Sequence, residues 1–226
     1  MLDWTAVETV MLDMDGTLLD LYYDNHFWLS HLPQHYAGRH GLDLASAREQ
    51  LISRFASQHG TLNWYSVDFW SHALELDIGL LKHETAELIA IRPSTLDFLQ
   101  ALRQSGRATW LVTNAHHKSL NLKLDRTGIG QYFDRIICSH DFDAPKESQD
   151  FWQRLRGQEP FDPARSLLID DSISVLASAK TYGIGQLLTI AQPDSQRPVR
   201  EGLGFPALHS FAEIMPIPVY VPNKSS

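Results

Sequence analysis

The feature that most constrains this chain is an apolar run that ends abruptly at two aspartates, Val10-Met11-Leu12-Asp13-Met14-Asp15-Gly16-Thr17. Uninterrupted apolar residues are typical of a central parallel strand, and open α/β sheets bind ligands at the carboxyl ends of their strands. Side chains two residues apart share one face of a strand, so we expect the carboxylates of Asp13 and Asp15 to converge. Two close carboxylates raise each other's pKa unless a cation lies between them, and Mg2+ prefers such hard oxygen ligands.

Five apolar runs predict a parallel sheet. They are Val7 to Leu12, Ala108 to Thr113, Arg135 to Cys138, Ser166 to Asp170 and Gln186 to Ile190. Helical patterns separate the later runs, and a glycine suited to end a helix closely follows each pattern. These patterns cover Thr95 to Gln104, Ser119 to Thr127 and Ile173 to Tyr182. Strands that alternate with helices predict an α/β fold with a doubly wound parallel sheet.

A long insertion separates the first two predicted strands. Residues 13 to 107 span about 95 positions, whereas a crossover between parallel strands needs only about a dozen. Within the insertion, apolar residues recur with a helical period over 44–55, 63–74 and 83–89. We therefore expect a small helical bundle at 20–88 on a core formed by 1–19 and 89–226. Weak signals near the end predict a loosely attached tail at 216–226.

Composition narrows the class of protein. A chain of 226 residues, 43% of them hydrophobic, suits one core with one insertion, and a net charge of −8 argues against a nucleic acid polymer as partner. No apolar run approaches the roughly 20 residues of a membrane span, and no signal peptide is evident, so we expect a cytoplasmic protein without a membrane partner. A monomer and a small homo-oligomer stay as alternatives. The lone Cys138 excludes an internal disulfide and is expected to be a buried strand residue.

The first aspartate pair has an ordinary interpretation, a strand end followed by an Asp-Gly turn. The whole stretch, however, resembles motif I of the haloacid dehalogenase-like hydrolase superfamily. The resemblance implies that Asp13 is the nucleophile that accepts a phosphoryl group and that Asp15 is the general acid and base. Such a division is chemically sound, because a nucleophile splits a difficult hydrolysis into two displacements while a second carboxyl moves the proton. The second aspartate also favours phosphoryl transfer over dehalogenation.

Two further strand ends carry candidate phosphate ligands. Thr113 and Asn114 could donate hydrogen bonds to a phosphoryl oxygen, although the pair is equally compatible with a helix N-cap. Lys146 follows Pro145 at a predicted helix start, where a cation needs a compensating anion or faces solvent. The resemblance extends to motifs II and III. It implies that Thr113 binds phosphate with Asn114 beside it, and that Lys146 neutralises Asp13 and the transferring phosphoryl group.

A fourth strand end has the same pattern as the first, because the apolar run Leu167 to Ile169 is followed by two aspartates, Asp170 and Asp171. It resembles motif IV, which implies that Asp171 binds the metal directly and leaves open whether Asp170 does. The sequence departs from the fuller motif, since the acid often found a few residues later is replaced by Ser174, Val175 and Leu176. The expected Mg2+ ligands are Asp13, the main-chain carbonyl of Asp15, Asp171 and, with its role open, Asp170.

The resemblance implies that the inserted bundle at 20–88 is a helical cap between motifs I and II, hinged near Asp20 and Arg92. The insertion is dense in aromatic residues, most of which we expect to pack between the cap helices. They are Tyr22, Tyr23, Phe27, Trp28, Trp64, Tyr65, Phe69 and Trp70. Some could stack a planar base over a phosphate site, and Asn63 and Trp64 are the expected substrate contacts. Residues 24–28 and 61–65 resemble the bacterial GMP/IMP nucleotidase branch of the superfamily. That resemblance implies hydrolysis of purine nucleoside 5′-monophosphates.

The expected function is therefore that of a Mg2+-dependent phosphomonoesterase with an aspartyl-phosphate intermediate, acting on a small phosphate ester. A sugar-phosphate phosphatase or phosphomutase with the same core is one alternative. A receiver-like regulatory module, which also uses an acidic pocket, Mg2+ and a lysine, is another. His116 and His117 follow motif II and are expected to be solvated loop residues.

Overall fold

All strands of the sheet run parallel, in the order β3-β2-β1-β4-β5-β6. The structure is a computed structural model that describes residues 2–221. The strands are β1 Thr9–Leu12, β2 Ala108–Thr113, β3 Arg135–Cys138, β4 Ser166–Ile169, β5 Gln186–Ile190 and β6 Ala207–Leu208. The first five coincide with the predicted runs to within two residues, and only the short β6 was not predicted. The doubly wound parallel α/β fold is thereby confirmed.

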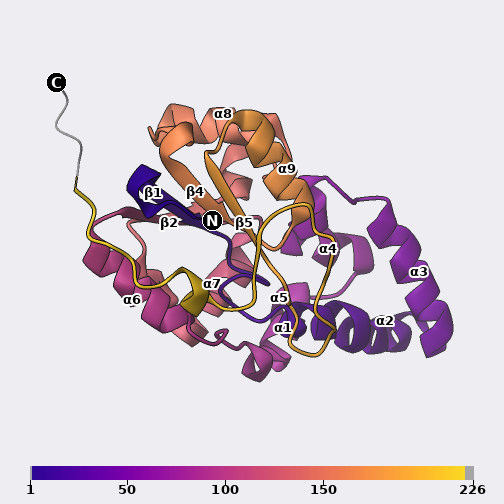
Figure 1. The fold of residues 1–226 in the computed structure, drawn as a ribbon. Coiled ribbons are helices and arrows are strands. Elements are labelled where there is room, and N and C mark those ends of the chain that lie inside the picture. Colours follow the sequence, from indigo (N-terminus) through magenta and orange to yellow (C-terminus); the bar gives the residue numbers. More distant parts are fainter. Residues whose placement is uncertain (1, 222–226) are drawn as a thin grey trace.

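Helices cover both faces of the sheet (Figure 1), which explains why its strands read as uninterrupted apolar runs. On one face lie α6 Thr95–Ser105 and α7 His117–Thr127, and on the other lie α8 Gln149–Gln158 and α9 Ile173–Tyr182. Neighbouring residues of β1 pack on opposite faces: Leu12 clusters with Phe98 and Leu102 of α6, and Met11 clusters with Trp152 of α8. The strand order changes direction beside β1, so the carboxyl ends of β2, β1 and β4 form one adjacent set.

The insertion between β1 and β2 is helical. It contains α1 Tyr22–His26, a π-helical turn Phe27–His31, α2 Leu32–His40, α3 Leu44–Ala56, α4 Val67–Leu74 and α5 Ile78–Glu84, with 3-10 turns at Leu62–Tyr65 and Ala86–Leu88. Its apolar side chains form a cluster of their own around Phe27, Leu51 and Trp70. In Figure 1, α2, α3 and α4 extend to one side of the sheet and its covering helices. No helix among residues 2–221 is long and apolar enough to cross a membrane.

Two predicted helices of the insertion have different bounds in the structure. The stretch 63–74 is broken at Ser66, whose hydroxyl accepts a hydrogen bond from the Phe69 amide at 3.1 Å and caps α4. The stretch 83–89 is also wrong as one helix, because α5 begins at Ile78 behind the Asp77 cap and ends at Glu84. At 63–74 a capping side chain overrode an apolar period that continued across it. At 83–89 the chain leaves α5 and forms the separate 3-10 turn Ala86–Leu88.

The expectation of a loose tail is wrong for residues 216–221. The Arg107 guanidinium donates to the carbonyl of Pro218 at 2.5 Å, and the Tyr220 amide donates to the carbonyl of Ser105 at 2.7 Å. The Tyr220 hydroxyl donates to Glu8 at 2.7 Å. Residues 222–226, the rest of that expectation, lie outside the described part of the chain. Cys138 is buried at the end of β3, as predicted.

We expect Phe98→Ala to lower the free energy of unfolding by about 3–5 kcal/mol, because it removes a fully buried ring and leaves a cavity. The ring of Phe98 stacks on that of Phe211 at 4.5 Å between centroids, so the substitution also loosens the chain after β6. Urea unfolding followed by circular dichroism measures the change. Ile52→Ala is the matched control, since Ile52 is 65% exposed and its truncation should change the free energy by less than about 0.5 kcal/mol. Equal effects of both substitutions would contradict the assigned core.

Candidate active site

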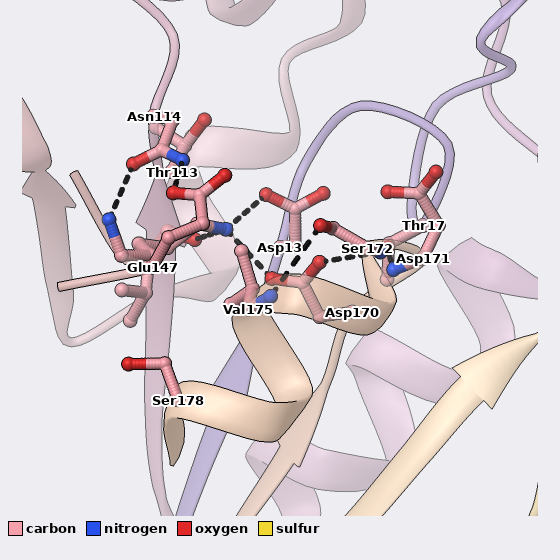
Figure 2. A network of polar contacts seen from close by, with 12 residues as sticks. Asp13, Thr17, Thr113, Asn114, Glu147, Asp170, Asp171, Ser172, Val175 and Ser178 are labelled. Carbon is pink, nitrogen blue, oxygen red and sulfur yellow. Dashed lines mark hydrogen bonds and ion pairs between the residues drawn. The ribbon is translucent and has the colours of Figure 1, made fainter. Parts of the chain in front are cut away.

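The centre of the site is the buried ammonium group of Lys146, which is shared by the carboxylates of Asp13 and Asp170; Figure 2 shows these two carboxylates close together. Its Nζ contacts Asp13 Oδ1 at 2.5 Å and Asp170 Oδ2 at 2.7 Å, and donates to the carbonyl of Val112 at 2.9 Å. Burial would lower the pKa of Lys146, but the two carboxylates outweigh burial and raise it, so the group is charged. The solvent-facing alternative for Lys146 is excluded, because only 1% of the residue is exposed.

Gly16 allows the loop after β1 to approach the loop after β4. It has φ +82°, and a Cβ atom there would lie 2.7 Å from the Asp171 carboxylate, so a larger residue would both strain the backbone and collide. The Thr17 hydroxyl accepts a hydrogen bond from the Asp171 amide at 3.1 Å, which joins the two loops directly. The glycine and hydroxyl of the first motif therefore set the separation between Asp13 and Asp171.

Three carboxylates form a donor set that suits a divalent cation. Oxygen atoms of Asp13, Asp170 and Asp171 all lie within 4.8 Å of one another. Among residues 2–221, no hydrogen bond or ion pair reaches the Asp171 carboxylate, and burial with two acidic neighbours raises its pKa well above the usual range. Lys146 offsets one of the three negative charges, which leaves the two that a divalent cation would neutralise. Hard oxygen ligands of this kind fit Mg2+.

The residues after β2 face the same centre. Thr113 and Asn114 are buried and line the cavity above Asp13. The Thr113 hydroxyl accepts from the Ala115 amide at 3.0 Å. Asn114 accepts from the Lys146 amide at 2.9 Å and donates to Glu147 at 2.9 Å, so it also holds the loop that carries the lysine (Figure 2). Both side chains thus have local partners while bordering the space where a substrate would lie.

Asp15 has a different cationic partner from Asp13, namely Lys123 of α7. The Lys123 ammonium lies 2.7 Å from Asp15 Oδ1 and 2.6 Å from Asp24 Oδ2, and Asp24 is also paired with Lys82 at 3.0 Å. Burial raises the pKa of Asp15 to about 6 against the opposing charge of Lys123. Burial would raise the pKa of Asp24 as well, but its two lysines outweigh burial and hold that pKa at about 2.

A cavity of about 380 Å³ joins these carboxylates to the inserted helices. Its apolar lining comes mainly from the insertion and includes Leu21, Trp28, Leu29, Phe55, Trp64, Tyr65, Val67 and Trp70. Trp64 therefore borders the cavity. Asn63 is not among the lining residues, and its amide donates to Gln58 at the surface at 3.1 Å. His117 is exposed as expected, whereas His116 borders the cavity.

Three of the charged groups in the site, Lys82, Lys123 and Glu147, were not predicted from the sequence. Lys82 and Lys123 lie on helices where lysines normally face solvent, yet they are 3% and 1% exposed. Glu147 accepts hydrogen bonds from Asn114 and, at 2.6 Å, from the hydroxyl of Tyr65 in the insertion. The one available signal was the position of Lys123 on the apolar side of its helix, since it follows Leu120 by three residues.

Comparison with known proteins gives matches along most of the chain. A family model described as haloacid dehalogenase-like hydrolase matches residues 7–183. The GMP/IMP nucleotidase YrfG of Escherichia coli (strain K12) is 37% identical over 213 residues, which cover 94% of this chain and 96% of that protein. A phosphoglycolate phosphatase of Pseudomonas fluorescens (strain Pf0-1) is 29% identical, over 77% of this chain and 66% of that protein.

Solved structures agree on the fold. The crystal structure of a HAD phosphatase from Thermococcus onnurineus superposes with a TM-score of 0.74 at 22% identity, over 92% of this chain and 96% of that one. Family membership excludes the receiver-like regulatory module as an alternative. The four strand-end motifs, the parallel sheet that carries them and these matches lead to one conclusion: the chain belongs to the haloacid dehalogenase-like hydrolase family and is an enzyme of its phosphatase class.

Proposed function

We propose that this enzyme is a Mg2+-dependent phosphomonoesterase that hydrolyses purine nucleoside 5′-monophosphates such as GMP and IMP. The observation that carries the proposal is the position of Asp13, at the base of a cavity with carboxylates and Lys146 on one side and aromatic rings on the other. The 37% identity to a GMP/IMP nucleotidase, over nearly the full length of both chains, supports the choice of substrate.

In the first proposed step, the Asp13 carboxylate attacks phosphorus and the bond from phosphorus to the 5′-oxygen breaks. The departing oxygen takes the proton of Asp15, which yields the nucleoside and an aspartyl-phosphate. A raised pKa of about 6 suits Asp15 to this role, because an acid that is too strong would hold no proton near neutral pH. Lys146 and Thr113 are proposed to bind the phosphoryl oxygens.

In the second step, water attacks the same phosphorus and gives a proton to Asp15, while the bond to the Asp13 oxygen breaks. Inorganic phosphate leaves and both carboxyl groups return to their starting states. When bound by Asp13, Asp171 and the Asp15 carbonyl, with Asp170 as a further candidate, Mg2+ would supply positive charge that offsets the phosphate. The protein provides little covalent chemistry beyond the nucleophile, so positioning and electrostatics carry most of the rate.

The inserted helices at 20–88 are proposed to act as the cap that selects the substrate, on a core formed by 1–19 and 89–226. Trp64 is the proposed stacking partner of the purine, because its ring borders the cavity that leads to Asp13. Asn63 is retained as a proposed contact for the edge of the base. A contact there requires its amide to leave Gln58 and turn toward the cavity.

We expect Asp13→Asn to lower kcat for GMP by at least about 1,000-fold, because an amide cannot form the aspartyl-phosphate. The fold should persist, which circular dichroism checks, since the substitution keeps the size of the side chain. Asp125→Asn on the exposed side of α7 is the matched control and should behave like the parent enzyme. Substantial phosphatase activity of Asp13→Asn would contradict the mechanism.

Removal of divalent metal should abolish turnover of every phosphate ester, and Mg2+ should restore it. Asp171→Asn should raise the Mg2+ concentration needed for half-maximal activity by at least about 10-fold, because its carboxylate has no partner among residues 2–221 and is assigned to the metal. Electron paramagnetic resonance of bound Mn2+ measures metal affinity independently of activity. Full activity in the presence of a chelator would contradict the proposed metal requirement.

Trp64→Ala should lower kcat/KM for GMP by about 5- to 150-fold, the equivalent of the roughly 1–3 kcal/mol that stacking on one base contributes. Its kcat/KM for p-nitrophenyl phosphate should change much less, and Trp64→Phe should restore part of the loss. Assays of the parent on nucleoside monophosphates and sugar phosphates test the substrate class, and product analysis identifies a phosphomutase. Equal losses on GMP and p-nitrophenyl phosphate would argue against stacking at Trp64.

A further inference from the structure

Four side chains of alternating charge form a continuous series of ion pairs that runs from Asp15 into the inserted helices. Asp15 contacts Lys123, Lys123 contacts Asp24, and Asp24 contacts Lys82, with charged atoms 2.7, 2.6 and 3.0 Å apart. Asp15 and Lys123 belong to the core, whereas Asp24 lies on α1 and Lys82 on α5 of the insertion. The four groups carry no net charge together, so each ion in the chain depends on its neighbours for compensation.

Lys123 is the member whose position most needs an explanation. Its side chain is 1% exposed, and burying an ammonium group costs several kcal/mol unless carboxylates compensate it. Here two carboxylates do so, and the ammonium also lies 5.3 Å from the centre of the Tyr23 ring, a cation–π distance. An apolar side chain would fill this site without that cost, so the position calls for a charge rather than only for volume.

The contact with Asp15 leaves that carboxyl available for chemistry. The Lys123 ammonium lies 2.7 Å from Asp15 Oδ1, whereas no hydrogen bond or ion pair reaches Asp15 Oδ2 from the described residues. Asp15 also borders the cavity. The ammonium group therefore restrains one oxygen of the carboxyl and leaves the other without a partner among the described residues. By contrast, Asp24 accepts proper hydrogen bonds from both Lys123 and Lys82.

We propose that Lys123 is a positioning residue that directs the Asp15 carboxyl toward the leaving oxygen, and that Asp24 of the insertion holds Lys123 in place. This inference rests on the proposed function, in which Asp15 donates a proton to that oxygen. It follows that the acid is fully assembled only when α1 lies against the core. Without Asp24, Asp15 is the one carboxylate partner left to the Lys123 ammonium among residues 2–221, and the ammonium draws it away from the substrate.

The test compares two aryl phosphates that differ in how much they need an acid. Phenyl phosphate releases a poorer leaving group than p-nitrophenyl phosphate, while both place a single ring in the cavity. In Lys123→Met, kcat/KM for phenyl phosphate should fall about 100-fold, the lower end of what a positioned acid contributes. For p-nitrophenyl phosphate it should fall less than about 5-fold, because that leaving group departs with little help from an acid.

Three further variants separate positioning from structural damage. Lys123→Arg keeps the charge and should restore most of the activity on phenyl phosphate, whereas Asp24→Asn should show the same selective loss, of about 10-fold. Lys118→Met removes an exposed lysine of the same helix and should leave both substrates unaffected. Thermal unfolding establishes which variants fold. If Lys123→Met does not fold, the two aryl phosphates are compared in Asp24→Asn instead.

Equal losses on the two aryl phosphates, in Lys123→Met and in Asp24→Asn, would overturn the proposal and assign these residues a structural role. This outcome differs from failure of the proposed function. A parent enzyme that does not hydrolyse GMP would contradict the proposed substrate, whereas the ratio between the two aryl phosphates depends only on how the acid is positioned.

Discussion

The contact between the Lys146 ammonium and the carboxylates of Asp13 and Asp170 is the interaction on which the rest of the site depends. Like charges about 4 Å apart repel by about 4 kcal/mol at the effective dielectric of a protein near its surface, so three buried acids could not converge without a cation. Lys146 offsets part of this repulsion permanently and leaves a net negative charge for a divalent ion. The loops after β1, β3 and β4 must then meet within a few ångströms, which requires Gly16 at one crossing and Asn114 at another.

A second group of charges, separate from the first, links the core to the insertion. Lys146 contacts Asp13 and Asp170 of the core, whereas Lys123 contacts Asp15 and has its other carboxylate partner on α1. Tyr65 adds a further contact between insertion and core through Glu147, the neighbour of Lys146. The segments of the insertion that line the cavity are thus connected by polar contacts to the surroundings of Asp13 and Asp15, the two carboxylates proposed to take part in the reaction.

Much of the core could be predicted because its signals are local. Strands β1 to β5 read as apolar runs, three helices of the core (α6, α7 and α9) show a helical period, and four motifs carry the polar residues of one family. Helix bounds within the insertion were less accessible, since Ser66 starts a helix inside a stretch whose apolar period is continuous, and α5 begins behind Asp77, before the predicted stretch 83–89. The attachment of residues 216–221 was not predictable either, because it depends on Arg107, which is distant in sequence and reaches the carbonyl of Pro218.

The sequence by itself determined the order of the motifs, the parallel sheet that carries them, and the identity of Asp13, Thr113, Lys146 and Asp171 as its strand-end polar groups. Only the tertiary structure decided which lysines are buried. A lysine on a helix normally faces solvent, and Lys123 and Lys82 become members of the site because Asp15 and Asp24 reach them from other elements. Local patterns encode burial and period, whereas the pairing of charges depends on distances between segments that only folding brings together.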